Sequence, residues 1–445
     1  MTAIDPGEQR TVIMAAPLPP APPAARDAAA PTGDRIEALD FVRGVALFGI
    51  LLMNIVGFGL PDAYYNPQNS GGAEGPNLLA WIVTQVGFEG TQRALFSMLF
   101  GASTILFLAR LEAAGRPDAA DLYVRRNLWL VAFGMINAFL LVWYGDILYA
   151  YGVTALFIYP FRNMAARWLM TIGIVTLLLG AAWNLKDARE AIHQNAAYEA
   201  AVAARDRGEE HDSAAITAWE GTRAEYVSSP ESVARTTEAM RGGYASAFRH
   251  VQPYNVYWQT WGLYRYFFDV FGMMLIGMAL FRMGVLTLHR RTGIYVAMML
   301  AGYAVGLTVN FLETRWIIAH QFSAVAFAEA EVTYDLGRLA MTLGHLGALL
   351  LFVRSGVLGW LRSAFAAVGR MAVTNYLMHS AICLMLFVGL GWYGQLQRYE
   401  LYYVVFAIWA FQLVFSPLWL SAFRFGPVEW LWRWLTYLKR PPLLR

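Results

Sequence analysis

The chain has 445 residues, of which 58% are hydrophobic and 15% are charged, and its mean hydropathy is +0.42. Soluble domains carry about 25% charged residues. The composition therefore excludes a soluble globular protein and indicates an all-α, polytopic membrane protein. The formal net charge of +3 gives no support to a nucleic-acid partner. The single cysteine, Cys383, excludes an intramolecular disulfide.

The first part of the chain is polar and then becomes apolar. Residues 1–34 are rich in Ala and Pro, which predicts a disordered cytoplasmic tail. Residues 35–185 are expected to form an N-terminal membrane half. Within it, residues 77–86 are too few to span a bilayer and are expected to lie in the interface. This half is predicted to contain five membrane-spanning helices, near residues 41–60, 94–109, 127–143, 145–161 and 168–185.

A long polar segment then interrupts the apolar pattern. Residues 186–256 mix Glu, Asp and Arg with Ala, and helical spacing without an apolar face predicts a solvated, extracytoplasmic helical loop. Residues 257–423 are expected to form a C-terminal membrane half, and residues 424–445 a Trp-rich interfacial segment. Five further spans bring the expected number of transmembrane helices to about ten; they lie near 258–282, 292–312, 331–353, 371–393 and 401–422.

The distribution of arginine and lysine predicts the orientation. Short cytoplasmic loops carry an excess of these residues. Here they gather after every second predicted helix and at the C-terminus. We therefore predict a multi-pass protein of the inner membrane with both termini in the cytoplasm and residues 186–256 outside. The positive charges that carry this prediction are Arg110, Arg116, Arg125, Arg126, Arg162, Arg167, Arg290, Arg291, Arg354, Arg362, Lys439 and Arg440.

The first predicted span holds two polar residues, Arg43 and Asn54. They are eleven positions apart in the sequence, which is about 16 Å and three turns of a helix, so both side chains project from one face. Such groups are costly in a membrane unless they face protein or water. Two interpretations remain open. Either Arg43 reaches the headgroups while Asn54 bonds a neighbouring helix, or both line a cavity.

Other polar residues also lie inside predicted spans. Arg265 and Asp269 are four positions apart and can pair along one face of a helix. Asn375 and His379 share the same spacing. A longer stripe on one helix predicts a hydrated interior; it consists of Asp335, Arg338, Thr342 and His345. The structural alternative is that the charges only pair with each other and that each histidine bonds an adjacent helix. The candidate substrate-binding residues are Arg43, Arg93, Asp146, Arg265, Asp269, Asp335, Arg338 and Asn375.

Common cofactor motifs are missing from the sequence. We find no cluster of His, Cys and Asp with the spacing of a metal site. Neither a phosphate-binding Gly-x-x-x-x-Gly-Lys run nor a dinucleotide fingerprint is present. We therefore expect no metal and no covalently bound cofactor.

Several segments resemble the YeiB-like membrane family. Residues 39–54, Leu-Asp-Phe-Val-Arg-Gly-Val-Ala-Leu-Phe-Gly-Ile-Leu-Leu-Met-Asn, are similar to the opening of that family, as are residues 95–102. Residues 369–377 and 425–433 resemble its C-terminal domain of unknown function, number 418. Together these segments bracket nearly the whole chain beyond residue 35. Most members of the family have no assigned biochemical function.

The opening Leu-Asp-x-x-Arg-Gly also resembles the transmembrane acyltransferases, such as heparan-alpha-glucosaminide N-acetyltransferase. This resemblance implies transfer of an acyl group from cytoplasmic acyl-CoA, with Asn54 as a catalytic residue that orients the thioester oxygen. That enzyme has a catalytic histidine after its first helix, whereas residues 61–76 here contain none. His345 and His379 are therefore the candidate bases. His345 is favoured, because the family commonly has glutamine at the position of His379.

Two classes of function follow. The first is an enzyme that transfers an acyl group from acyl-CoA, its co-substrate, to an envelope component or small-molecule acceptor outside the cytoplasm; Arg43 would then bind CoA phosphates. The alternative is a transporter whose polar path runs along the sixth, eighth and ninth predicted helices. A structural or partner-binding role through residues 186–256 is a third option. The bilayer is the expected partner in each case, and an oligomer is compatible with all three.

Overall fold

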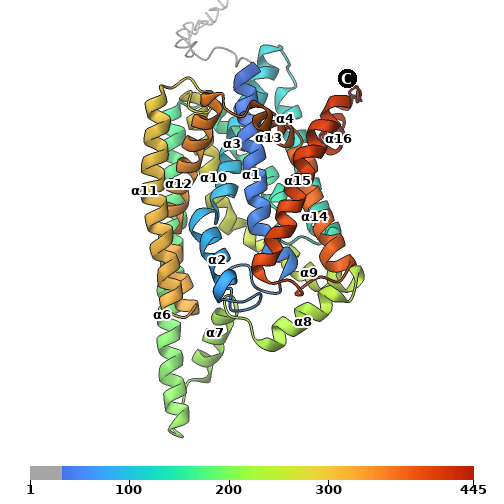
Figure 1. Ribbon diagram of the computed structural model, residues 1–445. Coiled ribbons are helices and arrows are strands. Elements are labelled where there is room, and N and C mark those ends of the chain that lie inside the picture. The colour runs from blue at the N-terminus through green and yellow to red at the C-terminus, as the bar shows by residue number, and fades with distance from the viewer. Residues whose placement is uncertain (1–32) are drawn as a thin grey trace, which may run out of the picture.

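The computed structural model describes residues 33–445, and it confirms the predicted all-α fold. Within these residues the β-structure is limited to one isolated bridge between Phe423 and Leu444. The predicted tail lies outside the described residues, except that Gly33 and Asp34 already belong to the first helix. The helices form one upright bundle, and a single long helical hairpin projects from one end of it (Figure 1).

The N-terminal half follows the predicted order of apolar segments. Two short irregular helices, η1 (Ile136–Leu140, a π-helix) and η2 (Tyr159–Asn163, a 3-10 helix), extend α4 and α5. The α-helices of this half are α1 (Gly33–Gly59), α2 (Gly75–Gly87), α3 (Thr91–Ala113), α4 (Ala119–Met135), α5 (Leu148–Ile158) and α6 (Ala166–Asp206).

The remaining helices complete the bundle and cover one of its ends. A second π-helix, η3 (Leu384–Gly389), extends α14 in the way that η1 extends α4. The α-helices are α7 (Ser213–Ala224), α8 (Pro230–Arg241), α9 (Tyr244–Gln259), α10 (Trp261–Arg282), α11 (Thr292–Ala319), α12 (Ala324–Ser355), α13 (Gly359–Arg370), α14 (Ala372–Cys383), α15 (Arg398–Ala422) and α16 (Pro427–Tyr437).

Eight segments of the described chain are long and apolar enough to cross a membrane, against about ten predicted spans. The two predicted spans that fall short are α4 with η1 and α5 with η2, which pack against each other as a hairpin. The short helix α2 coincides with the predicted segment 77–86, whose place in the interface stays a prediction. The amphipathic helix α13, which lies between the eighth and ninth predicted spans, was not predicted.

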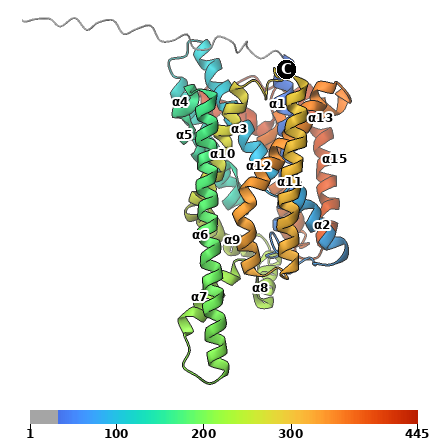
Figure 2. The same cartoon turned by 90° about the vertical axis from the view of Figure 1, so that its left-hand side faces the viewer.

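The polar segment 186–256 is helical, as predicted, but it does not begin with a break. α6 continues without interruption from its apolar part to Asp206 and forms the projecting hairpin with α7 (Figure 2). α8 and α9 turn back and cover the end of the bundle, where Met240, Ala247 and Val251 join a buried cluster. These two helices are therefore only partly solvated. The described ends of the chain lie at the opposite end from the hairpin (Figure 1).

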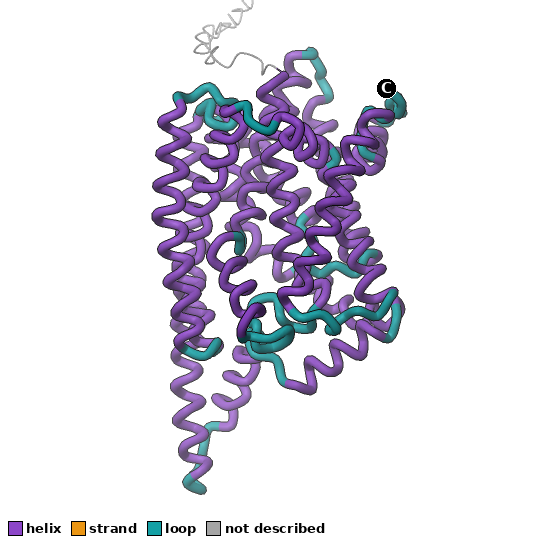
Figure 3. Tube along the Cα trace, viewed as in Figure 1, coloured by secondary structure: helices purple, strands orange, loops and turns teal. Residues whose placement is uncertain are grey.

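Glycines allow two pairs of helices to cross at very short distance. A Cβ atom on Gly44 of α1 would overlap the backbone carbonyl of Phe365 in α13, and one on Gly369 would overlap that of Asp40. α3 and α10 approach in the same way through Gly101 and Gly277. Close backbone approach through small residues is typical of helix association in membranes. Helix and loop segments are distinguished along the chain in Figure 3.

Candidate ligand chamber

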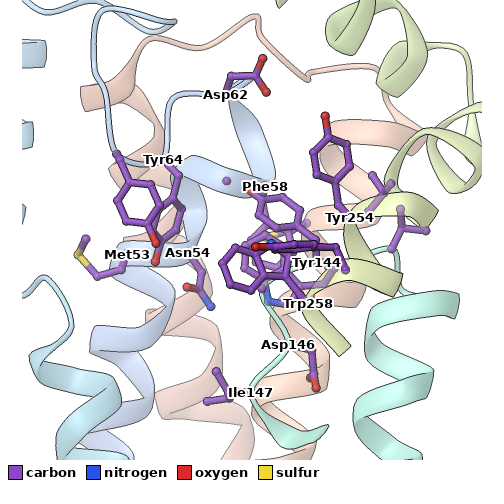
Figure 4. A pocket seen from close by; sticks show the side chains of 18 of the residues that line it. Met53, Asn54, Phe58, Asp62, Tyr64, Tyr144, Asp146, Ile147, Tyr254 and Trp258 are labelled. Carbon is purple, nitrogen blue, oxygen red and sulfur yellow. The ribbon is translucent and has the colours of Figure 1, made fainter. Parts of the chain in front are cut away.

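A cavity of about 710 Å³ lies between α1, α3, the loop that precedes α5, and the covering helices α8 and α9. We call it the chamber. Its volume falls within the range of about 300–1,000 Å³ that is usual for small-molecule sites. Its wall is rich in aromatic side chains, including those labelled in Figure 4: Phe58, Tyr64, Tyr144, Tyr254 and Trp258.

The chamber exists because η1 ends α4 early and leaves residues 141–147 as an irregular loop. Trp143 in this loop stacks on Phe58 of α1 with ring centroids 3.7 Å apart. Asn255 of α9 fixes the start of the loop, because its Nδ2 donates a hydrogen bond to the carbonyl of Ala138. The loop and α9 therefore both form part of the chamber wall.

Asn54 reaches the chamber from α1. Its carboxamide points into the cavity (Figure 4) and makes no hydrogen bond with the described residues. The prediction that Asn54 lines a cavity is therefore consistent with its position. The prediction that Arg43 lines the same cavity is wrong: its Nη1 lies 2.6 Å from Asp40 Oδ1, and its Nη2 donates to Ser103 Oγ at 2.9 Å.

A second cavity of about 210 Å³ adjoins the chamber. Its floor is an ion-pair network that joins three helices. Asp269 Oδ2 of α10 lies 3.1 Å from Arg93 Nη2 of α3 and 2.9 Å from Arg338 Nη1 of α12. Arg338 also pairs with Asp335 one turn away. The residues that line both cavities are Tyr65, Glu89, Arg93, Tyr226, Trp258, Arg265, Tyr266 and Glu331.

Arg265 and Asp269 do not pair with each other, contrary to the sequence-based prediction. Arg265 Nη1 instead lies 2.7 Å from Asp187 Oδ2, and its Nη2 donates to Asn184. The physical reason is the continuation of α6 beyond its predicted end, which brings Asp187 within reach. Asp269 is then left to Arg93 and Arg338 on the neighbouring helices.

The predicted hydrated stripe of α12 divides into a part that lines the second cavity and a part that lines neither cavity. Asp335 and Arg338 line the second cavity, although the Arg338 side chain is only 2% exposed. Thr342 is fully buried and donates to the carbonyl of Arg338. His345 contacts the hydroxyl of Tyr303 at 3.0 Å and the carbonyl of Gly87 at 2.8 Å. It therefore joins α12 to α11 and α2, and it lines neither cavity.

His379 and Asn375 also lie outside both cavities. His379 Nε2 contacts Gln412 Oε1 at 2.9 Å, and Gln412 Nε2 donates to the carbonyl of Asn375. Asn375 Nδ2 in turn donates to Ser416 Oγ at 3.0 Å. This closed network joins α14 to α15. The structure thus places both residues at a helix–helix contact, in agreement with the structural alternative.

The other two candidate binding residues line the chamber. Arg93 lies between the two cavities, as described above. Asp146 accepts hydrogen bonds from Asn137 Nδ2 and from the backbone N–H of Tyr149, both at 2.8 Å. It thereby holds the first turn of α5 and presents a carboxylate to the cavity.

One residue of the chamber, His250 of α9, did not figure among the candidates. Burial lowers the pKa of its imidazole below the ordinary value of 6.5, with Asp62 opposing the shift. The side chain is therefore neutral at pH 7. The sequence held one signal for its position: Ala247 and Val251 flank it at helical spacing and indicate that α9 has a buried face.

Comparison with known proteins gives the family. Residues 280–439 match the model of a "Protein of unknown function (DUF418)". The chain is 32% identical over 425 residues to "Uncharacterized protein YeiB" of Escherichia coli (strain K12), covering 92% of this chain and 98% of the relative. The chain belongs to the YeiB family. It is also 28% identical over 444 residues to "Uncharacterized protein YxaH" of Bacillus subtilis (strain 168), covering 93% of this chain and 97% of that protein. No solved structure matches.

The segments through which the chain resembles the YeiB family meet in the structure. Gly44 in the first segment packs against Gly369 in the third. Glu429 in the last segment accepts hydrogen bonds from the backbone N–H groups of Val373 and Thr374, at 2.7 and 3.1 Å. Its carboxylate thus caps the start of α14. These segments therefore fix how α1, α13, α14 and α16 pack together.

Proposed function

We propose that this YeiB-family protein transfers an acyl group from a cytoplasmic acyl-CoA to a small acceptor bound in the chamber. The observation that carries the proposal is the free carboxamide of Asn54, which projects into a cavity of ligand size. An amide donor placed in this way can stabilise the oxyanion that forms when a nucleophile attacks a thioester. The resemblance of residues 39–54 to transmembrane acyltransferases points to the same residue.

In this proposal the protein lies in the inner membrane, and the arginine-rich end of the bundle faces the cytoplasm. Arg43 lies at that end together with Arg110 and Arg370, all near the Asp40 carboxylate. Guanidinium groups suit the phosphates of CoA. The acyl arm would then extend about 16 Å along α1 to reach Asn54. Residues 46–52 of α1 are buried, so entry of the donor requires side chains to move.

The acceptor would be activated by His250, the histidine in the chamber wall. As a neutral imidazole it can take the proton of the attacking group. A bond forms between the acceptor heteroatom and the acyl carbon, and the C–S bond breaks. The thiolate of CoA leaves and receives the proton from the imidazolium. No other reactant is needed.

The test is incubation of the purified protein with labelled acetyl-CoA and extracts of the cell envelope. Label should move to a small acceptor, and Asn54→Ala should reduce the rate at least ~100-fold, since one oxyanion donor contributes about that factor. Met53→Leu is the matched control, because Met53 lines the chamber next to Asn54 but has no donor. Equal rates in Asn54→Ala and the unmodified protein would refute the proposed role.

A transporter is the second candidate, and the ion-pair network supports it. Buried charges inside a membrane often mark a solute or proton path. Arg93, Asp269 and Arg338 line the adjoining cavity from α3, α10 and α12. Residues of the sixth and eighth predicted helices line this cavity, whereas Asn375 and His379 of the ninth do not. Uptake of a chamber ligand into proteoliposomes without acyl-CoA would favour transport over transfer.

A further inference from the structure

We propose that the ligand of the chamber is a small organic cation, with an ammonium group beside the carboxylates and an apolar or aromatic body against the aromatic wall. This names the substrate class of the site. It rests on the proposed acyl transfer only for what happens to the ligand after it binds. For that transfer the ammonium group first gives up one proton to water, because only the neutral amine has the lone pair that attacks the thioester; its second proton then passes through His250 to the thiolate.

The first argument is the number of chamber carboxylates that have no ion-pair partner. Five carboxylates line the chamber, and none forms an ion pair within the described chain: Asp62, Glu89, Asp146, Glu225 and Glu331. Its two arginines are engaged elsewhere. Arg93 pairs with Asp269 and Arg265 with Asp187, neither of which lines the chamber. The chamber therefore holds more acidic than basic groups, five carboxyls against two arginines, and this excess disfavours an anion.

The aromatic wall is the second argument. The face of a tyrosine or tryptophan ring attracts a cation within about 6 Å of its centroid. The chamber already shows this contact, since the guanidinium carbon of Arg93 lies 4.9 Å from the ring centroid of Tyr266. Tyr144 and Tyr254 present further rings, with centroids 6.5 Å apart. Aromatic surfaces next to carboxylates are the usual setting for an alkylammonium ligand.

Two buried amides without partners give the third argument. Gln92 is 5% exposed, and its Oε1 has no hydrogen-bond partner in the described chain. Gln259 is 6% exposed, and its Nε2 likewise lacks one. Both residues line the chamber. Buried polar atoms are nearly always hydrogen-bonded. The free acceptor Gln92 Oε1 matches the N–H donors of an ammonium group, whereas the free donor Gln259 Nε2 requires an acceptor elsewhere on the ligand and does not itself favour a cation.

Binding of three probes with the same ring tests the inference: phenethylamine as a cation, 2-phenylethanol as a neutral molecule and 3-phenylpropionate as an anion. Affinity is measured by calorimetry on the purified full-length protein. We expect the amine to bind at least ~10-fold more tightly than the alcohol, and the anion to bind weakest. Equal affinity of the three probes, or a preference for the anion, would overturn the inference.

Variants then locate the charge. Glu225→Gln and Glu331→Gln should each reduce the preference for the amine over the alcohol by about 10-fold. Glu329→Gln is the matched control: it lies two residues before Glu331 on α12, bonds Trp316 Nε1 and lines neither cavity. Its preference should stay unchanged. A preference unaltered in both chamber variants would place the amine elsewhere and refute the proposal.

The outcome is separable from that of the proposed function. Selective amine binding without label transfer from acyl-CoA would support the inference and refute acyl transfer. Transfer to a neutral acceptor, with no preference for the amine probe, would support acyl transfer and refute the inference.

Discussion

Arg338 of α12 and Asp269 of α10 form an ion pair of 2.9 Å inside the bundle, where the arginine side chain is almost fully buried. Asp269 also holds Arg93 of α3. One carboxylate thus joins three helices and neutralises part of two positive charges below the chamber. Since charges in a membrane interior are costly unless paired, this contact couples the packing of the bundle to the shape of its ligand site.

Removing this carboxylate should destabilise the protein strongly. Asp269→Asn leaves two arginines short of a partner, and loss of one member of a buried pair costs about 3–5 kcal/mol. Asp187→Asn is the control, because its pair with Arg265 is partly exposed and should contribute at most about 1 kcal/mol. Thermal unfolding in detergent should show a much larger fall in Tm for Asp269→Asn. Similar shifts in the two variants would contradict the network.

The crossing of α1 and α13 should tolerate no side chain. Gly44→Val places atoms where the Phe365 carbonyl lies, so the two helices must separate, at a cost of at least about 1–3 kcal/mol. Gly293→Val at the start of α11 is the control, since nothing lies within 4 Å of its added Cβ. Size-exclusion chromatography should show a smaller monodisperse fraction only for Gly44→Val. An unaltered profile would show that the helices cross less closely.

The effect of replacing a histidine on acyl transfer should depend on whether that histidine lines the chamber. His345→Gln and His379→Gln alter helix contacts and should keep acyl transfer within about threefold of the unmodified rate in the protein that remains folded. His250→Gln should lower it at least ~100-fold, because a glutamine cannot accept the proton. Rates of label transfer normalised to folded protein decide this. A large loss in His345→Gln with full activity in His250→Gln would restore the base that the sequence favoured.

The pH dependence follows from the same imidazole. Burial lowers the pKa of His250 below 6.5, and the base must be neutral to act. The acidic limb of transfer at saturating substrates should therefore have its midpoint below pH 6.5. In His250→Gln this acidic limb should disappear. If the fall in rate at acidic pH persists in His250→Gln, a group other than His250 is responsible for it.

The membrane topology, with the projecting hairpin and the C-terminus on opposite sides, can be tested directly. Ala214 lies in α7 on the projecting hairpin, and Pro442 follows α16 at the other end of the bundle. Single cysteines at these positions, in a Cys383→Ser background, should react with an impermeant reagent from opposite sides of the membrane. Cys383 is buried, so its replacement removes little background labelling. Reaction of both from one side would contradict the proposed topology.

Much of the fold could be predicted because apolar runs of about 20 residues leave few alternatives to a membrane helix. α13 could not be predicted in this way, since its 12 residues are amphipathic and too few to span a membrane. Apolar length alone therefore predicts a loop between two spans. The continuation of α6 was missed for a related reason: the end of an apolar face does not end a helix when Ala, Glu and Arg continue it.

The site was predicted less well, because periodicity shows which face a residue occupies but not which helix lies opposite. Asn54 was placed on a polar face and does reach the chamber. Arg265 and Asp269 share spacing that allows a pair, yet partners on α6, α3 and α12 compete successfully. His250 lay in a segment read as solvated, although α9 closes the chamber.

The central claim is that Asn54 stabilises the oxyanion formed when an acceptor in the chamber attacks the thioester of a cytoplasmic donor, and proteoliposomes of sorted orientation test it most directly. Labelled acetyl-CoA is supplied on the side of Pro442 and phenethylamine on the side of Ala214, and the acetylated amine is measured over time. We predict product only with this arrangement, and at least ~100-fold less of it with Asn54→Ala than with Met53→Leu. No product in either arrangement, or equal product in the two variants, would contradict the account.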